Sequence, residues 1–226
     1  AAIAAARRLQ ESLFPPGPPR LAGFDIAGAV RPAEQASGDY FDFVSMQDGS
    51  TGDLVADVSS HGLGPALLMA QIQAYVRALC NEYRDPGELL SHANRLFAQN
   101  TSEHFVTLFL GCLNVNSSKM RYAGAGHHAH VLRADGSRYV LEGTGLPLGI
   151  MPEAPVETAA ELPLNCGDIV IFTTDGIQET SGRDGTEFGC DRLFQVVSDN
   201  REKPAAEIVE AIFEATRQYS GGERQA

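Results

Sequence analysis

The sequence is short of positive charge and has no long apolar run. Its 226 residues contain 17 Lys and Arg against 29 Asp and Glu, which gives a formal net charge of −12. Binding to a nucleic-acid backbone requires a concentrated basic patch, so that class of function is disfavoured. No apolar stretch is long enough to cross a bilayer. An acidic surface also repels phosphorylated substrates, so such a substrate would need a local positive charge, which metal ions could provide.

Cysteine is scarce and widely spaced. The four cysteines form no C-x-x-C pair, and they are Cys80, Cys112, Cys166 and Cys190. Isolated cysteines in apolar or helical patterns are typical of reduced thiols in a cytoplasmic protein, and they argue against a zinc site. We therefore expect a cytoplasmic location.

Histidines gather at one place, at His127, His128 and His130. Their alternation is typical of a strand, which would place His128 and His130 on one face. A metal box is the other interpretation, but no cysteine or acidic residue has ligand spacing to them. We favour polar strand positions.

The chain opens with AAIAAARRLQESLF, residues 1–14, which carries a short heptad-like apolar stripe. PPGPP at 15–19 ends this predicted helix. The helix could pack on its own domain or end a coiled coil from an upstream module, and so short a stripe does not decide between them. We expect residues 1–19 to be a linker or regulatory helix with a Pro-rich stop. Residues 20–226 would then form one domain, excised from a longer protein.

Apolar patterns predict two blocks of strands, each followed by helices. The predicted strands cover 24–31, 39–46, 52–58, 105–115, 119–125, 128–134, 138–142, 156–162 and 168–174, with a loop at 143–155. The predicted helices cover 62–82, 85–100, 190–199 and 204–219, the second with Asp85 as its N-cap. Short turns between strands favour antiparallel sheets. This order predicts an α+β fold in which helices cover two sheets.

Aspartates stand where apolar strands meet turns, at Asp39, Asp57 and Asp175. Each of them alone is explained by a turn or a helix cap. Together they indicate a metal site, because a carboxylate at a buried strand end needs a partner and no Lys or Arg lies in the flanking turns. Hard oxygen ligands suit Mg²⁺ or Mn²⁺. Backbone and water could approach the ions at the neighbouring glycines, which are Gly38, Gly62 and Gly176.

Several motifs occur in a fixed order along the chain: SGDYFDF, VADVSSHGLGPALLMA, FVTLFLGCLN, YAGAGHH, GLPLGI, DIVIFTTDGIQET and FGCDRL. In this arrangement the sequence resembles the metal-dependent protein phosphatase (PPM) family, and in particular its bacterial SpoIIE/RsbU-like branch. RRLQESLFPPGPP also resembles the helix that precedes the domain in that branch. The resemblance covers nearly the whole chain, and several motifs in register make it specific.

The resemblance implies an α-β-β-α sandwich of two antiparallel sheets, with a two-metal Mn²⁺ or Mg²⁺ centre at one edge between them. Asp57 would bridge both ions, which lie ~3.5–4 Å apart in such sites. The carbonyl of Val58 would bind one ion, which Asp39 would support directly or through a water. Asp175 would bind the other ion. A metal-activated water would attack phosphoserine or phosphothreonine directly, so Ser59 need not be a nucleophile.

The sequence departs from the family pattern in several places. The family normally has one further metal Asp in a late D-D-x-T strand, but this chain stops at GGERQA. We therefore expect the domain to be C-terminally incomplete, without its last strand and that ligand. The eukaryotic branch has Asp-Gly-His at the bridging Asp, whereas here the third position is Ser59. His61 is favoured as a helix-start residue over a proton donor.

Two further departures concern an arginine and a serine. We find no clear match for the phosphate-gripping Arg of the eukaryotic enzymes, and Arg31 is interpreted as a solvated strand-end residue. DVSS replaces the more usual DVSG, so Ser60 adds a Cβ where glycine is common, close to the predicted metals.

The remaining aspartates are interpreted without a metal role. Asp42 follows Asp39 by three residues in a predicted strand and so faces away from it, which favours a surface or turn-facing position. Four others each adjoin a glycine and are predicted turn residues, and they are Asp53, Asp135, Asp168 and Asp184. AGAGHH is expected to form a tight strand connection near the site.

The leading hypothesis is a Mg²⁺/Mn²⁺-dependent serine/threonine protein phosphatase that serves as the output domain of a bacterial signalling protein. By resemblance, its substrate would be a phosphorylated STAS-type antagonist of an anti-sigma factor. An upstream sensor in the same protein would control it through the N-terminal helix, which could also join two copies as a homodimer. Two alternatives stay open: a catalytically degenerate module that binds phosphoproteins, and a metal-dependent hydrolase of small phosphoesters.

Overall fold

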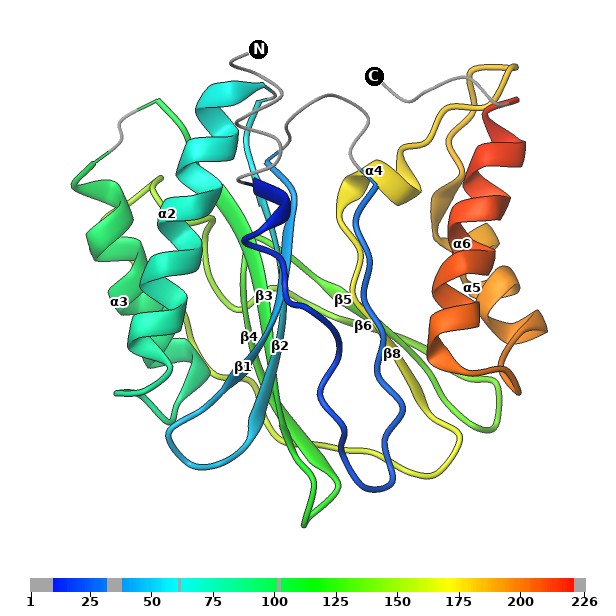
Figure 1. The fold of residues 1–226 in the computed structure, drawn as a ribbon, viewed down its shortest axis with the longest axis horizontal. Coiled ribbons are helices and arrows are strands. Elements are labelled where there is room, and N and C mark those ends of the chain that lie inside the picture. Colours follow the sequence, from blue (N-terminus) through cyan, green and yellow to red (C-terminus); the bar gives the residue numbers. More distant parts are fainter. Residues whose placement is uncertain (1–9, 32–37, 61, 101–102, 222–226) are drawn as a thin grey trace.

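The molecule is a layered sandwich. The computed structural model describes residues 10–31, 38–60, 62–100 and 103–221. Its strands form two antiparallel sheets that face each other, with helices on both outer sides (Figure 1). Helices α2 (Leu63–Leu79) and α3 (Pro86–Ala98) cover one sheet, and α5 (Gly189–Asp199) and α6 (Ala205–Tyr219) cover the other. This order confirms the predicted α-β-β-α sandwich.

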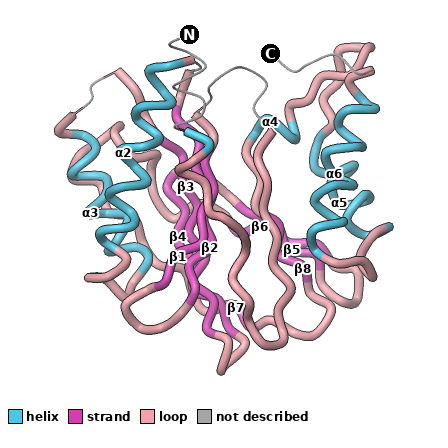
Figure 2. Tube along the Cα trace, in the orientation of Figure 1, coloured by secondary structure: helices cyan, strands magenta, loops and turns pink. Residues whose placement is uncertain are grey.

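The larger sheet has five strands in the order β1-β2-β3-β4-β7 (Figure 2). Their bounds are β1 Tyr40–Ser45, β2 Thr51–Val58, β3 Val106–Asn114, β4 Lys119–Ala125 and β7 Leu162–Pro163. Strands β1 and β2 form the expected hairpin, with Tyr40 opposite Ala56. Strand β2 also pairs along its whole length with β3, so that Val58 lies opposite Val106. The strand that carries Asp57 is therefore held on both sides.

The smaller sheet has three strands in the order β6-β5-β8. Their bounds are β5 Ala129–Leu132, β6 Arg138–Leu141 and β8 Ile169–Ile171. The short helix α4 (Asp175–Gln178) follows β8 closely and lies at the upper end of the gap between the sheets (Figure 1). The segment that carries Asp175 therefore has little regular structure of its own.

Helix α3 begins where its sequence predicts. The Asp85 carboxylate accepts a hydrogen bond from the Glu88 N–H at 2.9 Å, and Pro86 occupies the first turn. This cap satisfies one of the N–H groups that a helix start leaves free. On α2, the residues at helical spacing that include Ile72 and Val76 are buried against the larger sheet, as expected.

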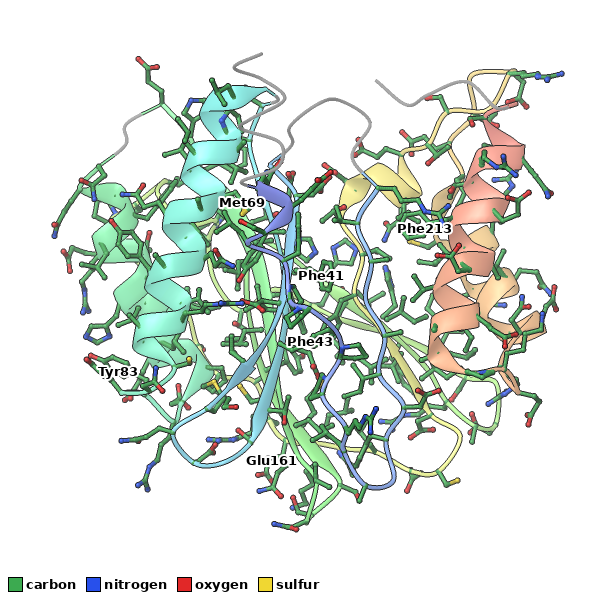
Figure 3. All side chains as sticks on the ribbon, in the orientation of Figure 1. Phe41, Phe43, Met69, Tyr83, Glu161 and Phe213 are labelled. Carbon is green, nitrogen blue, oxygen red and sulfur yellow. The ribbon has the colours of Figure 1, made fainter. Side chains whose placement is uncertain are left out.

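Strand alternation divides the core into layers. On β2, Leu54 and Ala56 pack toward α2 and α3, whereas Val55 points between the sheets. Phe41 also belongs to the layer between the sheets, and its ring meets that of Phe43 edge-on at 5.8 Å (Figure 3). Because side chains alternate along a strand, the odd-numbered residues of β1 and β2, like Phe41 and Val55, point between the sheets.

The predicted strand at 24–31 is wrong. Phe24 forms a single bridge with Leu21, and residues 25–31 are in no strand. The backbone at Gly28 passes so close to the Phe41 ring that a Cβ there would lie 2.7 Å from it. Asp25 accepts a hydrogen bond from the Ala205 N–H at 2.7 Å. The segment is thus held by side-chain contacts rather than by a ladder, which its alternating pattern does not distinguish.

The predicted strand at 156–162 is mostly wrong as well, since β7 covers only Leu162–Pro163. Glu157 donates its N–H to Thr144, and Ala159 donates to Tyr122. These backbone bonds go to different segments, so no continuous ladder forms. Proline at 163 also lacks the N–H that a longer pairing would use. The other predicted strands and helices are present, most of them shortened at their ends.

The N-terminal stripe is only partly described. Residues 10 and 11 are helical, and Leu13 and Phe14 pack against the core of the larger sheet. The apolar stripe predicted in residues 1–14 consists of Ala2, Ala6, Leu9 and Leu13, and the first three of these lie outside the described residues. The division into residues 1–19 and 20–226, and the expected missing strand and Asp, therefore stay predictions.

The expectation for Asp42 is wrong in one respect. Asp42 does face away from the gap between the sheets, but its carboxylate is fully buried. It accepts two hydrogen bonds from the Arg77 guanidinium, at 2.7 and 3.0 Å, and one from the Tyr40 hydroxyl. The arginine arrives from α2, far along the chain, so the local sequence gave no sign of this partner.

The expectation for Asp53 is also wrong. Asp53 is no turn residue but lies within β2, opposite Phe43 on one side and Gly111 on the other. Its Oδ1 atom is buried without a hydrogen-bond partner among the described residues. Burial raises the pKa of this carboxyl to about 7. The other aspartates of this group do lie in or beside turns, and they are Asp135, Asp168 and Asp184.

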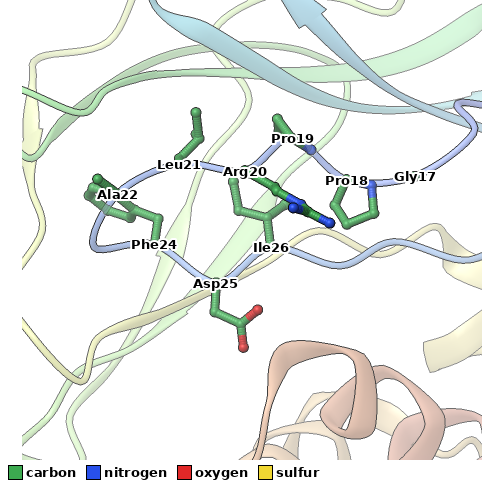
Figure 4. A pocket seen from close by; sticks show the side chains of 9 residues that line it. All are labelled: Gly17, Pro18, Pro19, Arg20, Leu21, Ala22, Phe24, Asp25 and Ile26. Atoms are coloured by element: carbon green, nitrogen blue, oxygen red, sulfur yellow. The ribbon is translucent and has the colours of Figure 1, made fainter.

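Other features of the described chain agree with its composition. Its cysteines are free thiols, of which Cys80 and Cys112 are buried. No helix in the described ranges is long and apolar enough to cross a membrane. An open hollow of about 670 Å³ lies within the loop of residues 17–26 (Figure 4). The predicted metal-binding aspartates do not line it, so it lies apart from the site described next.

Candidate metal centre

The larger sheet places two of the predicted carboxylates side by side. Tyr40 lies opposite Ala56, and one further step of the same register sets Asp39 opposite Asp57. On the other side of β2, Asp57 lies opposite Thr107 of β3. By strand parity this row faces the gap between the sheets, as Phe41 and Val55 do. Directly opposite residues have Cβ atoms ~4.5–5.5 Å apart, so Asp39 and Asp57 are close neighbours.

Helix α4 brings further carboxylates to the same place from the smaller sheet. The Asp39 carboxylate accepts a hydrogen bond from the Thr174 hydroxyl and is repelled by the charge of Asp175. Asp57 is repelled by the charges of Asp39, Asp175 and Glu179. The predicted residues Asp39, Asp57 and Asp175 are therefore brought together, although they come from opposite sheets.

The electrostatics of this cluster show an excess of negative charge. Desolvation by burial, together with repulsion by the neighbouring carboxylates, raises the pKa of Asp57 to about 7. The pKa of Asp39 is raised as well, mainly by burial, and the hydrogen bond from Thr174 opposes this shift. No Lys or Arg is among the groups that shift either pKa. An anionic cluster whose central carboxylates, Asp39 and Asp57, are half-buried favours a bound cation or protons.

The residues present fit a divalent cation. The close approach of Gly38 to β2 would not admit a side chain, because a Cβ at Gly38 would lie 2.6 Å from the Val58 carbonyl oxygen. Carboxylate and carbonyl oxygens are the ligands that Mg²⁺ and Mn²⁺ prefer. Within the described ranges, no group of three or more His, Cys, Asp or Glu side chains converges enough to hold an ion unaided. An ion here would therefore need backbone oxygen and water too, as is usual for Mg²⁺.

The segment after Asp57 is tightly folded. Ser59 donates its backbone N–H to the Phe105 carbonyl at 3.0 Å, and its hydroxyl accepts the Phe105 N–H at 3.1 Å. Ser60 has a φ of +77°, in the left-handed region that glycine adopts more easily. Gly62 follows with a φ of +100°, just before α2. His61 lies outside the described residues, and its role stays a prediction.

Gly176 and Arg31 complete the set of predicted residues. Gly176 lies exposed in α4, next to Asp175. Arg31 is not simply solvated, because it pairs with Glu210 and lies over the Phe213 ring, 4.5 Å from the ring centre. These contacts direct it toward α6, so nothing marks it as a phosphate ligand.

Glu179 and His127 were missed as site residues by the sequence analysis. Glu179 follows Asp175 by four residues, the spacing that puts two side chains on one helical face, and this signal could have found it. His127 is buried, and its ring contacts Thr107 and the Thr173 carbonyl. Burial lowers the pKa of His127 and favours its neutral form. AGAGHH does form a tight connection near the site, as expected.

The cluster of histidines is divided between different surroundings. His128 and His130 are neighbours, with ring centres 5.0 Å apart, which agrees with their predicted common face. The His130 Nε2 atom lies 2.9 Å from the Gln178 amide nitrogen, and burial lowers the pKa of His130 to about 4. The described surroundings of these rings hold no metal-ligand group.

Comparisons with known proteins identify the family. Residues 47–226 match the family of stage II sporulation protein E (SpoIIE). Since this match covers most of the chain, the protein belongs to the SpoIIE family.

The chain is also similar to a curated relative and to two solved structures. The chain is 29% identical over 216 residues to the phosphoserine phosphatase RsbU of Bacillus subtilis, covering 94% of this chain and 64% of RsbU. It superposes on the SiaA-PP2C domain of Pseudomonas aeruginosa with a TM-score of 0.83 at 20% identity, covering 99% and 91% of the two chains. The RsbU and RsbW domains of a Mycobacterium tuberculosis protein give a TM-score of 0.67 at 28% identity, covering 82% and 52%.

These likenesses establish a PP2C-like fold. The chain spans less than two thirds of the length of RsbU and a smaller share of other curated relatives. What those longer proteins do as wholes is therefore a matter of proposal for this chain.

Proposed function

We propose that this chain is the catalytic domain of a Mg²⁺/Mn²⁺-dependent protein serine/threonine phosphatase. The observation that carries the proposal is the meeting of Asp39 and Asp57 from one sheet with Asp175 from the other, with no Lys or Arg of the described residues among the groups that shift the pKa of Asp39 or Asp57. Family membership and the phosphoserine phosphatase RsbU among its relatives support the same conclusion.

In this proposal, Asp57 would help to hold both ions, Val58 (through its carbonyl) and Asp39 would serve one of them, and Asp175 would hold the other. When bound, such ions lower the pKa of a shared water and neutralise phosphoryl oxygens. Ser59, whose hydroxyl accepts the Phe105 N–H, is not needed as a nucleophile, because a metal-activated water would take that role. The chain's own contribution is to hold ionised carboxylates in place, at an edge where water and substrate can enter.

The openness of the site favours a phosphoprotein over a small phosphoester. Asp175, Gly176 and Glu179 are all exposed to solvent, in α4 or directly after it. A phosphorylated side chain on the surface of another protein could reach such an exposed site, whereas a small substrate usually requires an enclosing pocket. By family resemblance we propose a phosphorylated STAS-type anti-sigma-factor antagonist as the substrate, and a cytoplasmic location.

The N-terminal segment offers a route for control by an upstream sensor or by dimerisation. Gln73 of α2 donates a hydrogen bond to the Leu13 carbonyl. The Phe14 ring stacks on Phe41, with ring centres 5.6 Å apart, and Phe41 lies two residues after Asp39. A shift of this segment would therefore be felt at β1. Removing residues 1–14 should abolish regulation in a fusion with the sensor, and unchanged regulation would refute this route.

The catalytic proposal is tested by phosphate release from a phosphoserine protein in the presence of Mn²⁺. We expect release by the wild type, none with a chelator, and a loss of at least about 10³-fold in Asp57→Asn, equivalent to roughly 4 kcal/mol of transition-state stabilisation. Asp53→Asn is a matched control, because the same change is made on the same strand and face. It should retain activity within a few-fold.

The possible outcomes separate the hypotheses. Full activity in Asp57→Asn would remove Asp57 from the bridging role. Absence of release by the wild type would require the same assay on a chain extended beyond residue 226. An extended chain that binds phosphoprotein without cleaving it would favour the degenerate binding module instead.

A further inference from the structure

A hydrogen-bonded histidine connects the two sheets beside the carboxylates. The His127 Nδ1 atom lies 3.0 Å from the Thr107 hydroxyl of β3, in the larger sheet. The His127 Nε2 atom lies 2.9 Å from the carbonyl oxygen of Thr173, which follows β8 of the smaller sheet. The imidazole is buried, so both bonds are shielded from water.

The direction of both hydrogen bonds is fixed by chemistry. A carbonyl oxygen only accepts, so His127 Nε2 must carry the proton and donate to Thr173. In a neutral imidazole the other nitrogen then accepts, so Nδ1 accepts a hydrogen bond from the Thr107 hydroxyl. The ring is therefore satisfied on both sides in a single tautomer.

The ends of this connection are next to the predicted ligands. Thr107 lies directly opposite Asp57 in the sheet register. Thr173 stands two residues before Asp175, at the entry to α4. The connection thus joins the neighbour of one carboxylate to the backbone just before the other.

The Asp175 side has few other means of support. Strand β8 has only three residues, and α4 has four residues, none of which is buried. The apolar contact of α4 is Ile177, which is partly buried against the core beneath α5 and α6. Polar contacts add to this support.

A second group of hydrogen bonds fixes the same segment to its own sheet. The Gln178 amide nitrogen donates to the Thr173 hydroxyl at 3.0 Å and to His130 Nε2 at 2.9 Å. Its amide oxygen accepts from the Cys190 thiol at 3.3 Å. Gln178 holds α4 against the smaller sheet. The hydrogen bonds of His127 instead connect this segment to the larger sheet.

The position of His127 is itself constrained. Gly126 has a φ of +63°, and a Cβ there would lie 2.3 Å from the Pro147 ring. A Cβ at Gly124 would lie 2.4 Å from the His127 carbonyl oxygen. The tight turn therefore presents the imidazole between the sheets without freedom to move away.

We propose that His127 is a positioning residue that sets the separation of Asp57 and Asp175 by linking Thr107 to the Thr173 carbonyl. This inference rests on the proposed metal centre. Its consequence is that loss of the link weakens binding of the ion that needs both carboxylates, even when the protein stays folded. A merely structural histidine would change the stability of the protein without changing the metal affinity of the folded form.

The test measures Mn²⁺ binding directly, from the electron paramagnetic resonance signal of free Mn²⁺, without substrate. His127→Asn can accept from Thr107 but is too short to reach Thr173, whereas His127→Gln can place an amide N–H near the position of Nε2. We expect about a tenfold weaker Mn²⁺ affinity in His127→Asn, as is typical when the residue that supports a ligand is lost. His127→Gln should recover most of the Mn²⁺ affinity. The control His128→Asn, at an exposed neighbour, should leave the Mn²⁺ affinity unchanged.

Thermal unfolding in chelator shows whether each variant is folded, and affinities are compared only at temperatures where it is. If folded His127→Asn binds Mn²⁺ as the wild type does, or if Gln and Asn lose affinity equally, the inference is overturned. If the wild type itself binds no Mn²⁺, the metal centre falls, and the inference falls with it. If Mn²⁺ binds but no phosphate is released, only the catalytic proposal fails, because the binding data stand alone.

Discussion

The two sheets position their carboxylates by different means. In the larger sheet, β1, β2 and β3 have six, eight and nine residues, and Asp57 stands near the end of a strand that is paired on both sides. In the smaller sheet, the strands have four, four and three residues, and Asp175 lies on a helix without a buried residue. A backbone ladder places the first carboxylate, whereas side-chain hydrogen bonds place the second.

The same contrast extends to the helices. The core between the larger sheet and its helices is extensive, and nearly all of its members are fully enclosed. The core beneath α5 and α6 is smaller, and many of the side chains around it are only partly buried. The site takes carboxylates from both sheets. The position of its side chains therefore depends on the less enclosed core as much as on the more enclosed one.

Two matched leucine substitutions test this contrast between the cores, and they have the largest expected effect on the free energy of unfolding. Leu90 on α3 and Leu193 on α5 are both completely buried, one in each half. We expect Leu90→Ala to lower the free energy of unfolding by about 4 kcal/mol and Leu193→Ala by about 3 kcal/mol. The larger loss is expected for Leu90→Ala, because the more enclosed core around Leu90 can collapse less into the cavity that alanine leaves. Urea unfolding of both variants decides, and a reversed order would contradict the contrast.

Asp53 tests the layer between the two sheets, because its carboxyl group is buried there on β2. Its pKa is raised to about 7 by burial, above the ordinary value of 3.8. The folded form therefore holds its proton over a pH range in which the unfolded form has lost it, so this group's contribution to stability falls as pH rises from about 4 to about 7. Removing the carboxyl should relieve that loss.

We accordingly expect Asp53→Asn to be more stable than the wild type at pH 8 by up to about 4 kcal/mol, since the pKa shift is about three units and one unit corresponds to about 1.4 kcal/mol. The difference should shrink or reverse at pH 5. Urea unfolding between pH 5 and pH 8 in chelator measures it. A difference that does not vary with pH would show that Asp53 titrates normally.

The smallest effect is expected at Ser60, where β2 leaves the larger sheet for the site. Its φ of +77° is unfavourable for a residue with a Cβ, whereas glycine adopts it freely. Ser60→Gly should raise the free energy of unfolding by up to about 1 kcal/mol, because relief of this strain exceeds the extra chain entropy of glycine. Thermal unfolding measures the change, with Ser118→Gly, also at positive φ, as a comparison. A loss of stability in Ser60→Gly alone would mean that the serine side chain has a favourable contact.

Much of the site was predictable because it depends on local patterns and on motif order. Asp39 and Asp57 lie near each other because a hairpin with a short turn fixes the register of β1 and β2. Asp85 caps α3 as its sequence predicts. Glu179 could have been found from its helical spacing to Asp175.

Other features depend on residues that are distant in the chain. The burial of Asp42 required Arg77 from α2, and the role of His127 required Thr107 and Thr173 from different sheets. Asp53 was misplaced because a neighbouring glycine signals a turn, while here the glycine lies within the strand. The segment 24–31 alternates like a strand, yet alternation does not say whether a hydrogen-bonding partner is present.

The sequence by itself determined the period of each main strand and helix, the hairpin that pairs Asp39 with Asp57, and the order of motifs that marks the family. These follow from short-range sterics and from the side-chain alternation of the backbone. Only the tertiary structure decided that Asp175 and Glu179 join them across the gap, that Arg77 neutralises Asp42, and that the Oδ1 atom of Asp53 is buried without a hydrogen-bond partner among the described residues. Burial and charge pairing depend on which surfaces meet, and that is settled only when the two sheets pack together.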